Sequence, residues 1–138
     1  KTEDIDEINI YKEIKQAFNI SAVRILVKPD TMYLDNYIID EEQRQAILFF
    51  EYNNEIIRYA IYLNDSDSSF AQRELDKKTD EYRIETKNTV IQVEEYTVDK
   101  YEEKRYVANF KYRDVNYQLM GIMEKEEFDE ILKNLVFL

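Results

Sequence analysis

Residues 105–123, with the sequence RYVANFKYRDVNYQLMGIM, decide the fold class of this chain. In the first half, every second residue belongs to one set: Tyr106, Ala108, Phe110 and Tyr112. A period of two predicts a β-strand, because successive side chains of a strand point to opposite faces. Arg113 and Asp114 separate this strand from a second apolar run at residues 115–123, so the stretch predicts an antiparallel hairpin. Gly121 lies inside the second strand and predicts a bulge or a close approach by the next helix.

Similar hairpins are predicted upstream. Residues 45–52 and 55–63 are apolar-rich runs on either side of Asn53-Asn54, and asparagine tolerates the positive φ that a tight hairpin turn requires. The other predicted strands lie at residues 23–27, 32–39, 82–86 and 90–98. Because hairpins make neighbouring strands antiparallel, we expect residues 23–123 to form one antiparallel sheet.

Both ends of the chain have the periodicity of amphipathic helices. A helix is predicted over about residues 2–19, ending at Asn19, from an apolar stripe at Ile5, Ile8, Tyr11, Ile14 and Phe18. A second is predicted over about residues 124–135, from a stripe at Phe128, Ile131, Leu132 and Leu135. We therefore expect a single α+β domain over residues 1–138. Its single curved antiparallel sheet has about seven strands, with the N- and C-terminal helices packed on one face.

The bulk composition excludes several classes of protein. The 138 residues are 44% hydrophobic, too large a share for an intrinsically disordered chain. A formal net charge of −11 repels phosphate backbones, so nucleic acid is not an expected partner. No run approaches the ~18 apolar residues of a membrane span, and no signal peptide is recognisable. The chain nevertheless opens at Lys1 without an initiator methionine, so we expect that a tag, a signal or an anchor preceded it.

The residue types that carry most enzyme chemistry are missing. There is no histidine and no cysteine, which excludes Ser-His and Cys-His couples and zinc sites built on those ligands. With one glycine, the chain has no glycine-rich phosphate loop. A pair of carboxylates remains an option, and one of Glu94 and Glu95, which lie mid-strand, is expected to point inward. Thirty acidic residues make close carboxylate pairs common on any surface, however, so we expect no catalytic residues and no cofactor.

A calcium loop is suggested by spacing but contradicted by residue type. Asp65, Asp67 and Ser69 occupy the first, third and fifth positions of an EF-hand-like loop. The sixth position requires glycine and holds Phe70, and the twelfth requires glutamate and holds Asp76. We therefore expect no metal site.

Four of the twelve tyrosines are candidate ligand contacts: Tyr59, Tyr106, Tyr112 and Tyr117. On the open face of a curved sheet they would present aromatic walls with hydroxyl tips to a protein, peptide, lipid or glycan. The alternative is that these rings cover the sheet where the helices do not.

The C-terminal third also resembles a known family. Residues 106–110, the following turn, residues 116–122 and the acidic start of the last helix resemble the ending of DUF4367 domains, where a strand carries a Tyr-x-Ile/Leu-x-Gly pattern. The Asn53-Asn54 hairpin and the polar loop before Tyr82 fit the same pattern, so the resemblance spans about residues 20–138. One departure is Glu124, where the family often places a Ser, Thr or Asp helix cap.

This resemblance implies an uncharacterised domain of Firmicutes located outside the cytoplasmic membrane, behind an N-terminal transmembrane helix and sometimes near sigma-factor regulation. It also implies an open half-barrel sheet similar to those of lipoprotein carriers and sigma-regulator sensors. The family supplies no catalytic residues.

Three functions are therefore weighed. The favoured one is a non-catalytic extracytoplasmic sensor or interaction domain, anchored to the membrane in the full-length protein. The alternative is an intracellular acidic inhibitor of the immunity type, whose charge would speed association with a basic partner. A carboxylate-based hydrolase is the third.

Overall fold

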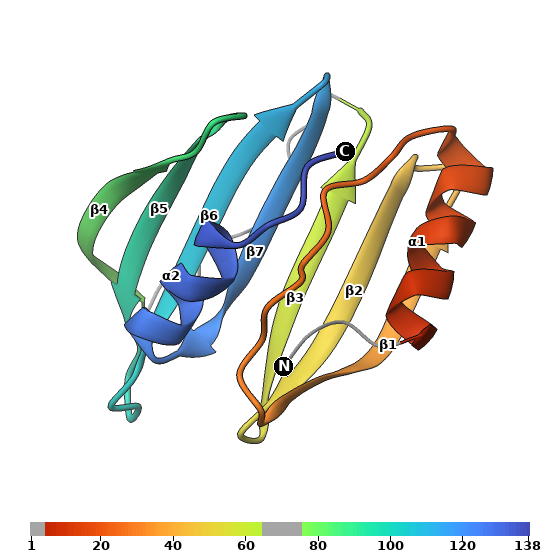
Figure 1. The fold of residues 1–138 in the computed structure, drawn as a ribbon. Helices are drawn as coiled ribbons and strands as arrows, with labels where there is room; N and C mark the ends of the chain where they lie inside the picture. The colour runs from red at the N-terminus through yellow and green to blue at the C-terminus, as the bar shows by residue number, and fades with distance from the viewer. Residues whose placement is uncertain (1–4, 65–75) are drawn as a thin grey trace.

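The computed structural model describes residues 5–64 and 76–138, and this part of the chain contains two helices and seven strands (Figure 1). In chain order they are α1 (Ile5–Phe18), β1 (Met32–Asp40), β2 (Gln45–Tyr52), β3 (Glu55–Tyr62), β4 (Lys77–Glu85), β5 (Val90–Thr97), β6 (Lys104–Tyr112), β7 (Val115–Met123) and α2 (Lys125–Lys133).

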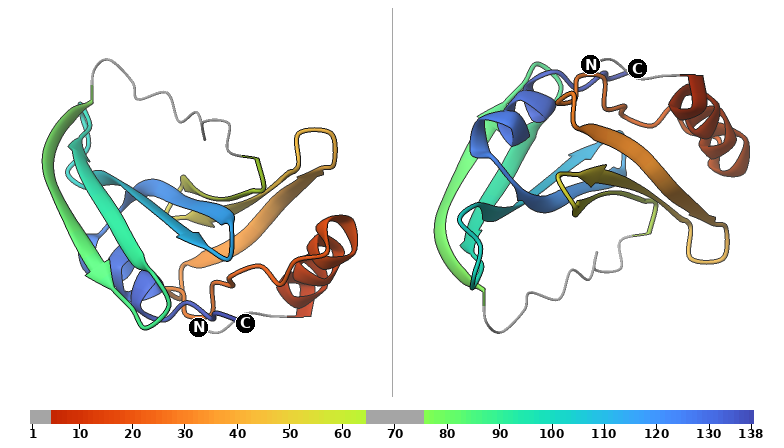
Figure 2. Two further views of the ribbon diagram at one scale, coloured as in Figure 1. Left: turned by 90° about the horizontal axis from the view of Figure 1, so that it is seen from above. Right: turned by 90° about the horizontal axis from the view of Figure 1, so that it is seen from below.

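The seven strands form one sheet in the order β1-β2-β3-β7-β6-β5-β4, and all neighbours are antiparallel. Two meanders, β1 to β3 and β4 to β7, meet where β3 pairs with β7 at the centre. Figure 2 shows that the sheet is curved, with β4 and β5 turned steeply away from β2 and β3. The predicted α+β architecture with a single seven-stranded antiparallel sheet is confirmed.

Turn chemistry fixes the hairpins where the sequence predicted them. Asn53 and Asn54 have φ values of 47° and 68°, and Arg113 and Asp114 have 50° and 64°. Two successive residues with positive φ are the signature of the tight turn whose twist matches that of antiparallel strands. Asn19, with φ 57°, ends α1 at the predicted position.

The register of these hairpins separates two faces of the sheet. One row of cross-strand partners is Leu48, Tyr59, Leu119 and Ala108, and the adjacent row is Ile47, Ala60, Gln118 and Asn109. We call the face with the first row the core face, because its residues join the main hydrophobic cluster with side chains of α1 and α2. The opposite face, which carries the second row, is the second face.

The predicted strand at residues 23–27 is not part of the sheet, which begins at Met32 instead of residue 23. The segment between α1 and β1 crosses the core face as extended chain, and Val23 and Ile25 are completely buried in the main cluster. Its ladder contact is a single antiparallel bridge between Arg24 and Val136. A short apolar run has the same pattern in a sheet and in a buried crossing segment, so the sequence did not distinguish them.

Gly121 lies inside β7 as predicted, and it pairs with Tyr106 without a register shift, so there is no bulge. The predicted close approach is present, but it is made by Ile57 of β3 and not by the final helix. A Cβ atom at Gly121 would lie 3.2 Å from the Cα of Ile57, closer than ordinary packing allows.

The terminal helix depends on its apolar stripe, since Phe128, Ile131 and Leu132 are completely buried. We predict that Leu132→Ala lowers the free energy of unfolding by about 2–5 kcal/mol, because it removes a buried side chain and leaves a cavity. Denaturant unfolding measures the loss. Lys133→Ala, at the exposed neighbouring position, is the control. A loss below about 0.5 kcal/mol in the Leu132 variant, as for a surface substitution, would contradict the packing of this helix.

Candidate functional site

The four tyrosines predicted to bind a ligand share one face, but it is the core face. Tyr59 is completely buried, and Tyr117 and Tyr106 are 2% and 3% exposed. Tyr112 is half-buried at the end of β6, where its ring meets Phe137 edge-on with centroids 5.0 Å apart. The expectation of an exposed aromatic wall is therefore wrong for three of the four, because helices and the crossing segment share the core with these rings.

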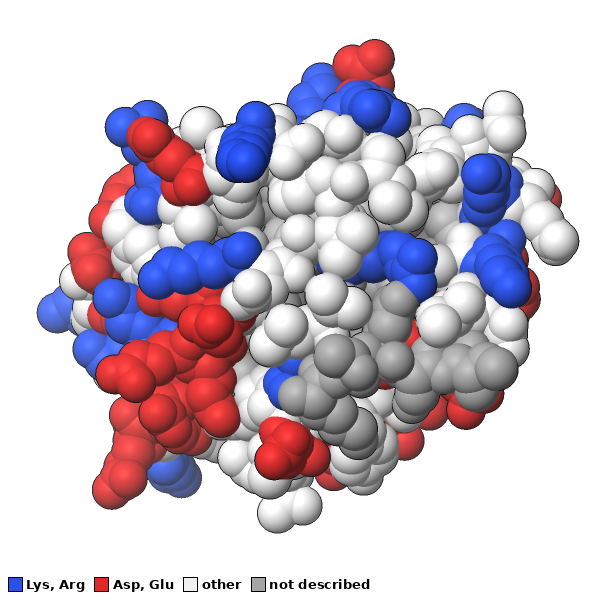
Figure 3. Space-filling model, viewed as in Figure 1, with Lys and Arg blue, Asp and Glu red and all other residues white. Residues whose placement is uncertain are grey.

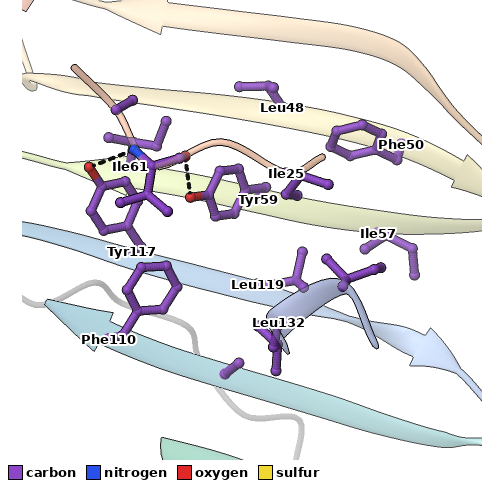
Figure 4. Close-up of a cluster of buried hydrophobic side chains, with 14 of the residues drawn as sticks. Ile25, Leu48, Phe50, Ile57, Tyr59, Ile61, Phe110, Tyr117, Leu119 and Leu132 are labelled. Atoms are coloured by element: carbon purple, nitrogen blue, oxygen red, sulfur yellow. Dashed lines mark hydrogen bonds between the residues drawn. The ribbon is translucent and has the colours of Figure 1, made fainter. Parts of the chain in front are cut away.

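The hydroxyl groups of these rings bind the crossing segment (Figure 4). Tyr59 donates to the carbonyl oxygen of Val23 at 2.7 Å, and the Val23 N–H donates to the Tyr117 hydroxyl at 3.1 Å. The Ile25 N–H donates to the hydroxyl of Tyr11 in α1, also at 3.1 Å. The extended segment thus obtains from tyrosines the backbone partners that a neighbouring strand would otherwise supply.

The rings also stack on one another across the central strands. Tyr117 lies between Tyr59 and Phe110, with ring centroids at 6.0 Å and 4.9 Å and nearly parallel planes. Such stacked pairs add to the stability gained by burial. The tyrosine cluster is consequently a structural element of the core, and its capacity to bind a ligand stays a prediction.

Tyrosines also bind the carboxylates of α2. Tyr52 donates to Glu127, and Tyr82 donates to Asp129 at 2.5 Å. Figure 3 shows acidic side chains gathered over α2, and basic side chains over α1. Two of the acidic residues of α2 are therefore bound to the sheet by hydrogen bonds, in addition to the apolar stripe.

Glu94 and Glu95 do not form a carboxylate pair, because successive strand residues point to opposite faces. Glu95 is the buried member, as one of the two was predicted to be. Burial alone would raise its pKa, but hydrogen bonds from Thr79, Tyr106 and Lys104 outweigh it and hold the pKa below its ordinary value. An ionised, fully bonded carboxylate is a poor proton donor.

Most of the loop weighed as a calcium site, residues 65–75, lies outside the described residues. Asp76 is described, and it accepts a hydrogen bond at 2.7 Å from the guanidinium of Arg105. Within residues 5–64 and 76–138, no group of three acidic side chains is placed to hold a metal ion.

A cleft of about 360 Å³ opens on the second face, beside the β2–β3 turn. Apolar side chains of β3 and β7 and two arginines line most of it: Ile56, Arg58, Met120, Ile122 and Arg105, with Asn54, Glu55 and Gly121 completing the lining. Arg58 and Met120 are cross-strand partners, so the register of β3 and β7 places cation and thioether side by side. Sequence patterns did not single out this site, because it is assembled by pairing between distant segments.

A second hollow of about 390 Å³ lies between α1 and β1. Its lining is largely polar and acidic, including Asp6, Glu13 and Asp35. The hydroxyl of Tyr37 crosses it to donate to Glu13 at 2.9 Å. This contact ties the helix to the edge strand, so the hollow is a seam between two elements and is less suited to a ligand than the second-face cleft.

Comparison with known proteins gives one match. The sequence model of a family described as "Domain of unknown function (DUF4367)" matches residues 22–135. No curated protein and no solved structure matches the chain. Among the described residues, no helix is long and apolar enough to cross a membrane.

The tyrosine cluster predicts a loss of stability in alkaline solution. Burial raises the pKa of Tyr117 from 10.0 to about 12, so the folded state holds its proton more tightly than the unfolded state. This contribution is complete below pH 10 and is lost as the pH rises towards 12. We predict that Tyr117→Phe costs about 1–3 kcal/mol at neutral pH, because the buried Val23 N–H loses its acceptor, and that it makes unfolding less sensitive to pH above 10.

Denaturant unfolding from pH 8 to 12 is the measurement for this prediction. Tyr101→Phe, at an exposed position, is the matched control and leaves the neutral stability unchanged. An unaltered alkaline slope in the Tyr117 variant would show that its phenol is hydrated in the folded state.

Proposed function

The chain belongs to the DUF4367 family, and we propose that it is a non-catalytic interaction domain that binds its ligand on the second face of the sheet. The observation that carries the proposal is the second-face cleft, whose volume of about 360 Å³ falls within the range of roughly 300–1,000 Å³ that is usual for ligand sites. Its mixture of apolar walls and a few charged groups also suits binding.

We infer that both helices and the crossing segment cover the core face alone. Side chains of α1, α2 and the crossing segment belong to one cluster with the core-face rows, which supports this arrangement. The second face carries a smaller buried cluster of Ile47, Ala60 and Tyr62, and the cleft opens on the same face of the sheet. The second-face cleft is then the proposed contact surface, and the buried tyrosines stabilise the sheet that carries it.

The groups in the cleft support binding over catalysis. The two arginines of the lining, Arg58 and Arg105, present N–H donors and no acceptor of their own, which suits the binding of an anion and does not supply a general base. Among the described residues that line the cleft, Glu55 is the one carboxylate, whereas carboxylate-based hydrolysis needs two. Glu95, the buried carboxylate considered as a catalytic group, belongs to the core face and is held ionised there.

We also propose that the domain works outside the cytoplasmic membrane, attached through a segment upstream of Lys1. The support is membership of a family whose likeness implies that location. Protease treatment of intact protoplasts that express the full-length protein is the test. Digestion of the domain without lysis is the expected result, and protection until lysis would contradict the proposed location.

The acidic surface over α2 favours one alternative, an inhibitor that binds a basic protein (Figure 3). Charge complementarity accelerates such associations. An acidic surface is also what keeps a chain with a net charge of −11 soluble, whereas a cleft with two arginines is not explained by solubility. We therefore favour the second-face cleft.

A fragment screen observed by NMR tests the proposed function. We predict that the compounds that bind shift amide resonances of Arg58, Met120 and their neighbours, and that they are recovered chemically unchanged. Met120→Trp should abolish these shifts, because the larger ring fills the cleft. Asn9→Trp, which fills the hollow between α1 and β1 instead, is the matched control and should preserve them.

Thermal unfolding of both variants verifies that they are folded. Shifts confined to the α1–β1 hollow would refute the proposed surface. Turnover of a compound that is lost in Glu95→Gln would refute the non-catalytic assignment.

A further inference from the structure

We propose that the second-face cleft takes a small organic anion with an apolar body, and that Arg58 holds its carboxylate or phosphate group. The inference rests on the proposed function, since it names the ligand of the same cleft.

Arg58 is half-buried, yet its hydrogen bonds are long and reach neutral groups. Its Nη1 lies 3.5 Å from the Tyr62 hydroxyl and 3.4 Å from Oε1 of Gln118. Among the described residues it has no carboxylate partner. Lys28, Lys104 and Arg105, the comparable cations, each pair with a carboxylate at 2.7–3.3 Å.

This difference matters because a guanidinium withdrawn from water loses hydration and needs anionic partners in return. The chain has thirty acidic residues, and none of those in the described ranges pairs with Arg58. The planar guanidinium has five N–H donors, and a carboxylate or phosphate accepts two of them side by side. The guanidinium of Arg58 therefore has N–H donors available for an oxyanion.

The walls of the cleft select the rest of the ligand. Ile56 is 50% exposed beside Arg58, and Met120 is half-buried across the strand pair. Ile122 completes an apolar surface along β7. An anion with an aliphatic or aromatic body would cover this surface and remove it from water, which a bare inorganic anion would not do.

Two charges near Arg58 limit the strength of the site. Asp76 already compensates Arg105 at 2.7 Å, so Arg105 contributes little free positive charge. Glu55 at the lining repels an anion, and the net charge of −11 opposes its approach from solution. The short-range contact with Arg58 must outweigh these effects, which makes binding depend on this one side chain.

Titration of the isotope-labelled domain with hexanoate, followed by the amide resonances of β3 and β7, tests the inference. Hexanamide is the uncharged analogue, acetate lacks the apolar body, and monohexyl phosphate presents the other oxyanion. We expect hexanoate or hexyl phosphate to bind in the cleft, and acetate and hexanamide to bind at least tenfold more weakly. The tighter of the two anions identifies the head group.

Arg58→Gln should weaken binding of the preferred anion by about tenfold or more, through the loss of a charge-assisted contact. Arg83→Gln removes an exposed arginine from the same face of the sheet and should leave the affinity unchanged. Circular dichroism melting shows that both variants are folded.

Equal affinity of the anion for the wild type and Arg58→Gln would overturn the inference, as would equal affinity for hexanamide. In both cases the cleft still binds, so the proposed function stands. Failure of every compound in the wider fragment screen to reach the cleft would overturn both.

Discussion

A buried stretch of extended backbone between α1 and β1 is the constraint on which the rest of the structure depends. Backbone groups without hydrogen bonds cost about 1–3 kcal/mol each when they are withdrawn from water. Val23 and Ile25 are completely buried, and tyrosine hydroxyls from β3, β7 and α1 bind their backbone. The same contacts therefore join the two central strands and the N-terminal helix to the segment between them.

This constraint explains why the tyrosines lie in the core. A phenol supplies a large apolar ring for packing and a hydroxyl at its tip for a backbone group, which phenylalanine lacks. Farther along the segment, Lys28 forms a buried ion pair with Glu7 of α1 at 3.0 Å, and this pair holds the segment to the helix. These contacts occupy the core face, and the proposed ligand site, with Arg58 and its apolar neighbours, lies on the second face.

Local chemistry in the sequence predicted most of the fold. Arg113-Asp114 and Asn53-Asn54 marked hairpins that the structure contains, and the stripe of Phe128 and Leu132 marked the final helix. The pattern of residues 23–27 predicts a strand and fits a buried crossing segment equally well, because a run of four or five apolar residues suits either role. Period-two alternation placed the tyrosines on one face, but alternation does not say which face the helices cover.

Turn residues and apolar periodicity do not predict the candidate site. Arg58 and Met120 are more than sixty residues apart, and only the pairing of β3 with β7 makes them neighbours. An isolated arginine in a strand carries no signal in sequence, since the absence of a partner is a property of the folded surroundings. The long connection to β4, which sends the chain to the far edge and brings β7 beside β3, was likewise not specified by any turn motif.

Amide hydrogen exchange at Val23 and Ile25 tests the central claim most directly, namely that tyrosine hydroxyls seal the crossing segment against the core face. The account predicts that these two amides exchange only on global unfolding, as slowly as the central amides of β3 and β7. Exchange at the rate of an exposed loop would contradict it, since the core face and its tyrosines would then be open to solvent.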